Sequence, residues 1–357
     1  MTASRRAEAI GVGPVASAVA YLGPRLAKIT RDPSMVYRFV RHHARHYLHD
    51  RRYRRLFARA AADLRVALET TLPVPVAASG DAAVHTLCGA RGVVDALFCL
   101  KTLYRFVPER YPLVIHEDGS FSDGDVRLVS RHFPGARVIR RAEADRAILA
   151  ELDARGLERC ADFRRTSVFA LKIFDLQHYA EGRRVCYVDA DVLFHRRPAA
   201  LLAALAAPDG EFADRYNVDV RSCFTWPADS VLREFGVLPP ARPVNSGLMV
   251  VRRDPPAWDV YERCLELAER DFWVEQSLWA VDFARNGAQP LPADYDVCFR
   301  DAWPGISESG RDDALRRRWH GRAVVSEHYC GGLDYRALFY DRALALHASE
   351  MAPGARP

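Results

Sequence analysis

Between residues 84 and 194 the sequence alternates short apolar, β-branched runs with segments of helical periodicity, and this alternation restricts the fold more than any other feature. It predicts strands at 84–88, 112–115, 136–139 and from 184 onward, with helices at 93–106, 123–132, 143–154 and 164–180 between them. A β-α-β-α order predicts an α/β fold with a largely parallel sheet. Ligands of such folds bind at the carboxyl ends of the strands.

The flanking regions follow a less regular pattern. Residues 245–251 are typical of a turn that feeds an apolar strand, 254–270 and 272–286 of helices, and 324–325 of a short strand. The segment 70–78, with its prolines and alanines, predicts a domain boundary. We therefore expect a basic helical extension at 1–72, an α/β domain at 73–345 and a flexible tail at 346–357.

The strand that begins at Arg184 ends in Asp189-Ala190-Asp191. Because alternate side chains of a strand project to the same side, the two carboxylates can converge just past the strand end. They would repel each other unless a cation, a proton or a basic partner compensates them. A hard divalent metal, Mg²⁺ or Mn²⁺, that carries a phosphorylated substrate is the favoured compensator. The alternative is an ordinary loop entry with two solvated acids.

Three downstream motifs could serve the same site. Asn245-Ser246-Gly247 offers small polar groups for hydrogen bonds to a sugar ring, although this tripeptide is also a common turn. Glu275-Gln276 could face a polar substrate, or the acid could simply favour the N-terminal dipole of its helix. His328, which precedes paired glycines, could complete a metal site with the two aspartates, although a lone histidine is usually not a ligand.

In this order the motifs resemble the nucleotide-sugar-dependent glycosyltransferases of the GT-A fold, and within them family 8, the glycogenin-like and lipopolysaccharide galactosyltransferase-like group. The resemblance spans roughly residues 83–340. It implies a Rossmann-like, mostly parallel central sheet flanked by helices. It also implies transfer of a sugar from a nucleoside diphosphate sugar, a UDP-sugar, to a glycan or lipid-linked acceptor. The anomeric configuration of the sugar would be retained, and the process would be bacterial polysaccharide synthesis.

The resemblance assigns roles by position. Asp189, Asp191 and His328 would bind the Mn²⁺ or Mg²⁺ that bridges the donor phosphates. Gln276 or Glu275 would lie near the reacting face of the sugar. The other donor-binding positions are Thr86, Leu87 and Gly89 with Glu117 or Asp118 at the nucleoside, one of Arg164, Arg165 and Lys172, then Asn245, Ser246 and Gly247 at the sugar, and Gly331 with Arg336 at the phosphates.

The chain departs from the family pattern at two positions. After the histidine the family has a glycine followed by Lys-Pro-Trp, whereas this chain continues Gly331-Gly332-Leu333-Asp334-Tyr335-Arg336. The phosphate-binding lysine is therefore missing unless Arg336 replaces it. Glu275 stands where the family generally has aspartate.

Other reactions and classes stay open. An inverting relative would need a carboxylate base, for which Glu275 and Asp271 are candidates. A haloacid-dehalogenase-like phosphatase would use Asp189 as nucleophile and Asp312-Asp313 as its later acid pair. That motif normally lies near the start of its domain, whereas here about 100 residues of α/β pattern precede it. The third class is a non-catalytic module that binds a nucleotide sugar.

The positive charge of the chain is concentrated at its N-terminus. Residues 1–70 carry 14 Lys and Arg against 5 Asp and Glu, whereas the remainder carries 37 against 41. A nearly neutral main domain gives no support to nucleic-acid binding. The basic segment, predicted as a helix over 31–70, either packs or dimerises, or lies on an anionic membrane surface.

Cysteine usage and hydropathy indicate the compartment. The eight cysteines form no CxxC pair, and several lie in apolar runs, so we expect reduced core residues of an intracellular protein. No apolar run approaches the length of a membrane span. We therefore expect a cytoplasmic protein, with the basic helix as its one candidate contact with the inner face of the membrane.

Overall fold

A computed structural model describes residues 58–180, 182–220, 224–253, 257–267, 273–297, 324–330 and 333–351. The chain divides into two compact units, 1–58 and 59–357, and the second contains every described residue except Ala58. Residues 58–70 are helical, and Leu64 and Leu68 on this helix are fully buried. The predicted boundary at 72 therefore lies inside the second unit, and most of the predicted basic helix lies outside the described residues.

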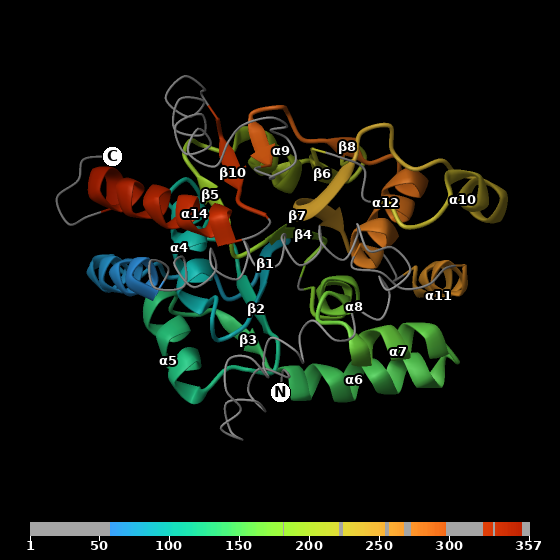
Figure 1. Ribbon diagram of the computed structural model, residues 1–357, viewed down its shortest axis with the longest axis horizontal. Helices are drawn as coiled ribbons and strands as arrows, with labels where there is room; N and C mark the ends of the chain where they lie inside the picture. The colour runs from blue at the N-terminus through green and yellow to red at the C-terminus, as the bar shows by residue number, and fades with distance from the viewer. Residues whose placement is uncertain are drawn as a thin grey trace, which may run out of the picture. The chain divides into compact units, whose positions relative to one another are not determined.

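The core of this unit is a seven-stranded sheet in the order β3-β2-β1-β4-β7-β6-β8 (Figure 1). Strands β3, β2, β1 and β4 are parallel, and β7 runs antiparallel to its neighbours β4 and β6. The prediction of an α/β fold with a largely parallel sheet is therefore confirmed. The strands are β1 Ala82–Cys88, β2 Leu113–Glu117, β3 Arg137–Ile139, β4 Arg184–Val188, β6 Arg215–Val218, β7 Val244–Arg252 and β8 Gln289–Pro290.

A second, three-stranded sheet has the order β5-β10-β9, with β5 Val192–Phe194, β10 Ser326–His328 and β9 Tyr295–Val297. β10 is antiparallel to β5, and His328 lies opposite Val192 in the register. This pairing brings a C-terminal segment beside the end of β4. It is the feature of the fold that assembles the candidate site.

Helices cover both faces of the large sheet. In β4, Val185 and Tyr187 pack in the core cluster that also holds Phe174 of α8, Trp258 of α11 and Trp279 of α12. Cys186, which lies between them, faces the other side of the sheet, where α9 contacts β4. The helices are α4 Val93–Tyr104, α5 Asp123–His132, α6 Arg141–Ala154, α7 Glu158–Thr166, α8 Ala170–His178, α9 Ala199–Ala206, α10 Ala228–Phe235, α11 Trp258–Glu266, α12 Val274–Asn286, α14 Leu333–Leu346 and the π-helix η2 His347–Met351.

Four local predictions need correction. The predicted helix 164–180 is two helices, because Ser167 adopts an extended backbone and its hydroxyl accepts the Phe169 amide. The run from 184 to 194 splits into β4 and β5, which belong to different sheets. The short strand near 324 lies at 326–328. Residues 347–351 of the predicted tail are helical, with the Ser349 hydroxyl donating to the Ala345 carbonyl.

The cysteines that the structure describes are all free thiols. Five of them, Cys88, Cys99, Cys160, Cys186 and Cys264, are buried, and Cys330 is partly exposed. The expectation of reduced core cysteines is met at these positions. Among the described residues, none of the helices combines the length and the apolar character that crossing a bilayer requires.

Candidate metal centre

Three potential metal ligands meet at the carboxyl end of β4. The backbone leaves the large sheet after Val188 and enters β5 at Val192, so that Asp189 and Asp191 lie in the intervening turn. Its two ends are held by backbone hydrogen bonds. The Asp189 amide donates to the Gly247 carbonyl on β7 (2.7 Å), and the Tyr329 amide donates to the Asp191 carbonyl (3.0 Å). The turn therefore has a fixed position relative to His328.

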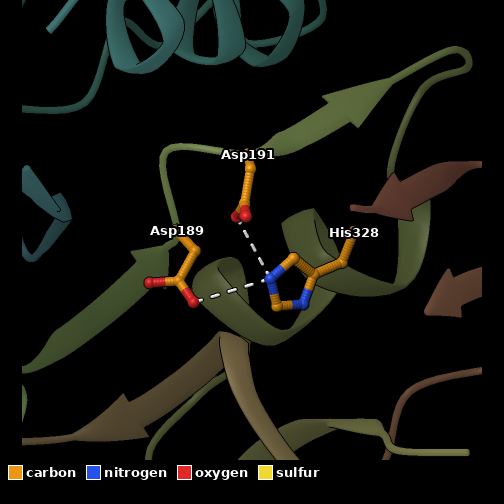
Figure 2. Close-up of side chains that lie close together, drawn as sticks. All are labelled: Asp189, Asp191 and His328. Carbon is orange, nitrogen blue, oxygen red and sulfur yellow. Dashed lines mark ion pairs between the residues drawn. The ribbon is translucent and has the colours of Figure 1, made fainter. Parts of the chain in front are cut away.

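The side chains of Asp189, Asp191 and His328 point toward one another (Figure 2). One ligand atom from each lies within 4.8 Å of the others. His328 Nε2 is 3.1 Å from Asp191 Oδ1 and 3.6 Å from Asp189 Oδ2. The aspartate side chains are 21% and 35% exposed, whereas His328 is 4% exposed. The cluster is thus built into the protein on the histidine side and open to solvent on the aspartate side.

Lys172 and Tyr187 hold the Asp189 carboxylate from behind. Lys172 Nζ lies 2.7 Å from Oδ1 and 2.9 Å from Oδ2, and the Tyr187 hydroxyl donates to Oδ1 at 2.6 Å. Burial alone would raise the pKa of Asp189, but Lys172 and His328 hold it below its usual value. Burial likewise disfavours the charged Lys172, but Asp189 and Glu275 raise its pKa overall. Asp189 is therefore ionised and fixed in one orientation.

The donor set fits a hard divalent cation. Two carboxylates and one imidazole are typical ligands of Mn²⁺, and carboxylates of Mg²⁺. Lys172 balances one of the two aspartate charges, so a surplus negative charge is left at the open side. Burial would lower the pKa of His328, but Asp191 and Asp189 raise it, so that a cation is already favoured at this position. These features are what a site for a positively charged ligand requires.

A polar group lies beside the cluster on β7, α12 and the end of β6. Asn245 Nδ2 donates to Asp219 Oδ2 at 3.0 Å, and Gln276 Nε2 lies 3.4 Å from the same oxygen. The Ser246 hydroxyl donates to Glu275 Oε2 at 3.0 Å. The structure therefore brings together the residues that the family resemblance places at the transferred sugar. Burial raises the pKa of Glu275 to about 7.

Asn245-Ser246-Gly247 does not form the predicted turn, because all three residues lie inside strand β7. Glycine is required at 247 for a reason other than a turn. A Cβ atom there would lie 2.1 Å from Cε1 of the His328 ring. The backbone of β7 thus forms one wall of the histidine position.

Two residues of this site were missed in the sequence. Asp219 follows the end of β6 and is buried beside Asn245. Its signal was a carboxylate after the short run Arg215–Val218, a weaker form of the pattern that identified Asp189. Tyr187 lies on β4 two residues before Asp189, and its hydroxyl donates to that carboxylate. The spacing could have indicated a contact, but an aromatic residue in a strand is most often core.

The expected nucleoside end lies at the ends of β1 and β2. Thr86 is fully buried, and Leu87 is partly exposed. The Asp118 carboxylate packs against Gly89, where a Cβ atom would lie 2.3 Å from Oδ2. The Glu117 carboxylate is occupied, because it accepts the backbone amides of Gly119, Phe121 and Arg141. The Asp118 carboxylate also accepts hydrogen bonds, from the amide and the hydroxyl of Ser120, so the choice between the two acids stays a prediction.

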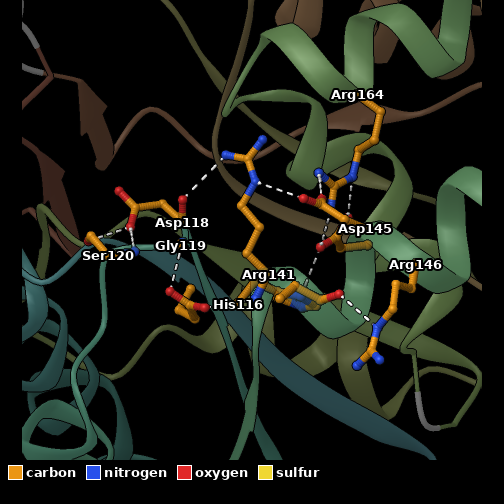
Figure 3. A network of polar contacts seen from close by, with 11 residues as sticks. His116, Asp118, Gly119, Ser120, Arg141, Asp145, Arg146 and Arg164 are labelled. Atoms are coloured by element: carbon orange, nitrogen blue, oxygen red, sulfur yellow. Dashed lines mark hydrogen bonds and ion pairs between the residues drawn. The ribbon is translucent and has the colours of Figure 1, made fainter. Parts of the chain in front are cut away.

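Arg141 of α6 supports this turn (Figure 3). Arg141 Nη1 donates to the Asp118 carbonyl at 3.3 Å, and its Nε lies 3.5 Å from Asp145. Asp118 itself accepts the amide and the hydroxyl of Ser120. The turn after β2 is thus tied to α6, which gives its carboxylate a fixed position at the edge of the sheet.

The three basic candidates before the Asp189 strand have different positions. Lys172 faces Asp189 as described. Arg164 is fully buried and pairs with Asp175 at 3.0 Å, and Arg165 is half-exposed and pairs with Asp153 at 3.2 Å. Arg336 lies on α14, and Gly331 lies outside the described residues. Replacement of the family lysine by Arg336 therefore stays a prediction.

Comparison with known proteins adds the following. No family model matches the sequence, and no curated protein matches it. The chain is similar to the bifunctional glycosyltransferase WbbM at 13% identity and a TM-score of 0.46, over 76% of this chain and 52% of that one, so it spans about half of that protein. It is also similar to the galactosyltransferase LgtC, crystallised with donor and acceptor sugar analogues (15% identity, TM-score 0.46, 76% and 97% coverage). A third similar structure is mouse xyloside xylosyltransferase 1 (12% identity, TM-score 0.47, 70% and 97% coverage).

Proposed function

We propose that this protein is a metal-dependent glycosyltransferase of the GT-A type, which moves a sugar from a nucleoside diphosphate sugar, a UDP-sugar, to a glycan or lipid-linked acceptor. The observation that carries the proposal is the meeting of Asp189, Asp191 and His328 within 4.8 Å at the carboxyl edge of the sheet. The cluster is open and has surplus negative charge on one side. On the other side it adjoins a buried set of hydrogen-bonding groups of the kind that a sugar ring needs.

The three ligands would hold Mn²⁺ or Mg²⁺, which when bound neutralises the charge that develops on a diphosphate leaving group. Lys172 and Tyr187 keep Asp189 ionised and fixed. This preorganisation removes the need to reorient the carboxylate during the reaction. Arg336, if it reaches the donor, would add a second positive charge at the phosphates.

The buried polar group would bind the transferred sugar. Asp219, Asn245 and Gln276 already share hydrogen bonds, so a sugar hydroxyl can enter a network with both donors and acceptors. We propose Gln276 and Glu275 near the reacting face and retention of the anomeric configuration, as the family resemblance implies. A buried carboxyl group with a pKa near 7, as Glu275 has, exchanges protons readily at neutral pH.

Calorimetry with Mn²⁺ and UDP tests the proposal. Wild-type protein should bind UDP only with the metal, and Asp191→Ala should abolish that binding. The matched control is Asp259→Ala, which removes a surface carboxylate paired with Arg155 and should change nothing. Equal UDP affinity of Asp191→Ala and wild type would refute the metal site. A panel of nucleotide sugars, screened for metal-dependent hydrolysis or transfer, would then identify the donor and separate an enzyme from a binding module.

We further propose that the basic N-terminal segment contacts anionic membranes. Its +9 charge over residues 1–70 is the supporting observation. Full-length protein should float with anionic liposomes and not with neutral ones, and replacing Arg51, Arg52, Arg54 and Arg55 by glutamate should remove the difference. Equal flotation with both liposomes, or no effect of the replacement, would refute the membrane contact and leave packing or dimerisation as its role.

A further inference from the structure

The side-chain amide of Asn245 has one orientation that its neighbours allow. Its Oδ1 lies 3.0 Å from the backbone amide nitrogen of Gly247, which can only donate. Its Nδ2 lies 3.0 Å from Oδ2 of Asp219, which accepts when ionised. Exchanging oxygen and nitrogen would place a donor against a donor and an acceptor against an acceptor. The assignment of this amide is therefore fixed by the hydrogen-bond network.

This orientation determines the tautomer of His328. Oδ1 of Asn245 is also 2.9 Å from Nδ1 of His328. Because this oxygen can only accept, Nδ1 must carry a proton and donate it. In a neutral imidazole the other nitrogen, Nε2, then has the free lone pair. Nε2 is the atom that faces Asp191 and Asp189 (Figure 2).

The position of the ring is fixed as well. Gly247 leaves room for it, since a Cβ atom at 247 would lie 2.5 Å from Nδ1 and 2.8 Å from Nε2. Asn245 and His328 are 5% and 3% exposed, so water does not compete for their hydrogen bond. Two residues of β7 therefore set both the place and the protonation of a side chain on β10.

We propose that Asn245 is a positioning residue of the metal centre: it orients His328 and keeps Nε2 available as a ligand. This inference rests on the proposed function and deepens it, because it gives Asn245 a role that is independent of the transferred sugar. Groups that hold the non-ligating nitrogen of a metal-bound histidine contribute about 10- to 100-fold to metal affinity or activity. Asp219 acts on His328 indirectly, because it fixes the orientation of the Asn245 side-chain amide.

The test measures Mn²⁺ affinity by electron paramagnetic resonance of the free ion, alone and with UDP, which lacks the transferred sugar of the donor. Asn245→Leu removes the acceptor at similar size and should weaken Mn²⁺ binding about 10- to 100-fold. The double variant Asn245→Asp/Asp219→Asn exchanges amide and carboxylate. It keeps an acceptor for Nδ1, a donor between the two residues and the net charge, so Mn²⁺ affinity should return to within a few-fold of wild type. Asp259→Ala, which removes a surface carboxylate paired with Arg155, is the control and should leave Mn²⁺ affinity unchanged.

The outcomes separate this inference from the proposed function. If wild-type protein fails to bind Mn²⁺ with or without UDP, the proposed function and this inference both fail. If wild type binds and Asn245→Leu binds equally well, only the inference fails. Gly247→Ala covers the case in which Asn245→Leu does not fold, since it displaces the ring without touching the amide and should also lose Mn²⁺ affinity. Unchanged affinity in folded Gly247→Ala would overturn the inference too.

Discussion

In the part of the chain that the structure describes, two clusters combine aspartates, a histidine and a basic residue, and their carboxylates have different partners. The metal-centre cluster contains Asp189, Asp191, His328 and Lys172. The second, which we call the closed cluster because arginines pair with its carboxylates, contains Arg164, Asp175, Asp145 and His116. Arg164 and Asp175 are 0% and 1% exposed, whereas Asp145 is 35% exposed. Arg164 forms two hydrogen bonds with Asp175, at 3.0 and 3.2 Å, and also pairs with Asp145 (Figure 3).

The partners of the carboxylates separate the two clusters, and exposure does not, because Asp145 and Asp191 are both 35% exposed. In the closed cluster, Arg164 pairs with Asp175 and Asp145, and Arg141 also pairs with Asp145, while burial lowers the pKa of His116 and raises that of Asp175 to about 7. In the metal-centre cluster one lysine faces two aspartates, and Asp191 is 35% exposed. Carboxylates that arginines already hold are not available to a ligand, whereas two aspartates that share one lysine keep a charge that can attract a cation. The same residue types therefore pair with one another inside the fold in one place and offer a candidate metal site in the other.

The largest expected effect is on activity, at Asp191. Asp191→Asn keeps the size of the side chain but removes a ligand charge, so metal-dependent turnover of the donor should fall about a thousandfold, which corresponds to about 4 kcal/mol of transition-state stabilisation. The free energy of unfolding should hardly change, because two effects oppose each other. The repulsion between the Asp191 and Asp189 carboxylates is removed, and the pairing of Asp191 with His328 is lost. Initial rates and urea denaturation measure the two quantities. A loss of less than tenfold would contradict the assignment.

The closed cluster should show the reverse pattern. Asp175→Ala leaves Arg164 buried without its main partner, and breaking such a pair costs about 3–5 kcal/mol of unfolding free energy. Mn²⁺ affinity of the folded protein should stay at the wild-type value. Urea denaturation at pH 7 measures the first effect and metal titration the second. A destabilisation below about 1 kcal/mol would show that the pair is not structural.

Glu275, which lies beside the metal centre, should make the unfolding free energy of the protein depend on pH. Burial raises the pKa of Glu275 from its usual 4.5 to about 7, so the folded state binds this proton more tightly than the unfolded state. Stability contributed by the protonated form is present below pH 4.5 and is lost as the pH rises to about 7, by an amount on the order of 3 kcal/mol. Glu275→Gln cannot titrate. The difference in unfolding free energy between variant and wild type should therefore change by this amount between pH 4.5 and 8, and a constant difference would disprove the raised pKa.

Mn²⁺ should stabilise the protein through the metal-centre cluster alone. At a free concentration 100 times the dissociation constant, one bound ion adds about 2.7 kcal/mol to the unfolding free energy. Asp189→Asn should lose this increment, whereas Asp175→Ala should retain it on a lower baseline. Thermal melts with and without Mn²⁺ give the comparison. An equal increment in wild type and Asp189→Asn would place the ion elsewhere.

Local patterns in the sequence predicted much of the fold and part of this site. The alternation of strands and helices predicted the parallel sheet, and helix 123–132 was predicted with its observed bounds. Asp189 and Asp191 were found because a strand end places alternate side chains together. The pairing of β10 with β5 could not be predicted, because nothing local specifies a contact between segments so far apart in sequence.

Long-range contacts also explain the errors. Asn245-Ser246-Gly247 has the composition of a turn, but Gly247 is needed by a histidine ring that arrives from β10. Asp219 was not predicted, because its role depends on Asn245 and Gln276, which reach it only in the folded chain. The choice among Arg164, Arg165 and Lys172 likewise needed the structure. Helical spacing alone does not show which side chain faces the end of β4.

The smallest expected effect concerns the choice among Arg164, Arg165 and Lys172. Arg165 pairs with Asp153 on the surface, with the two side chains 48% and 58% exposed, and such exposed pairs contribute at most about 1 kcal/mol to stability. Arg165→Ala should therefore leave both the unfolding free energy and the affinity for UDP with Mn²⁺ close to wild type. Lys172→Ala, by contrast, should weaken that affinity, because Asp189 loses the partner that holds it. If Arg165→Ala instead weakened UDP binding and Lys172→Ala did not, the donor would lie against α7, and the balance of charge at Asp189 would not determine where it binds.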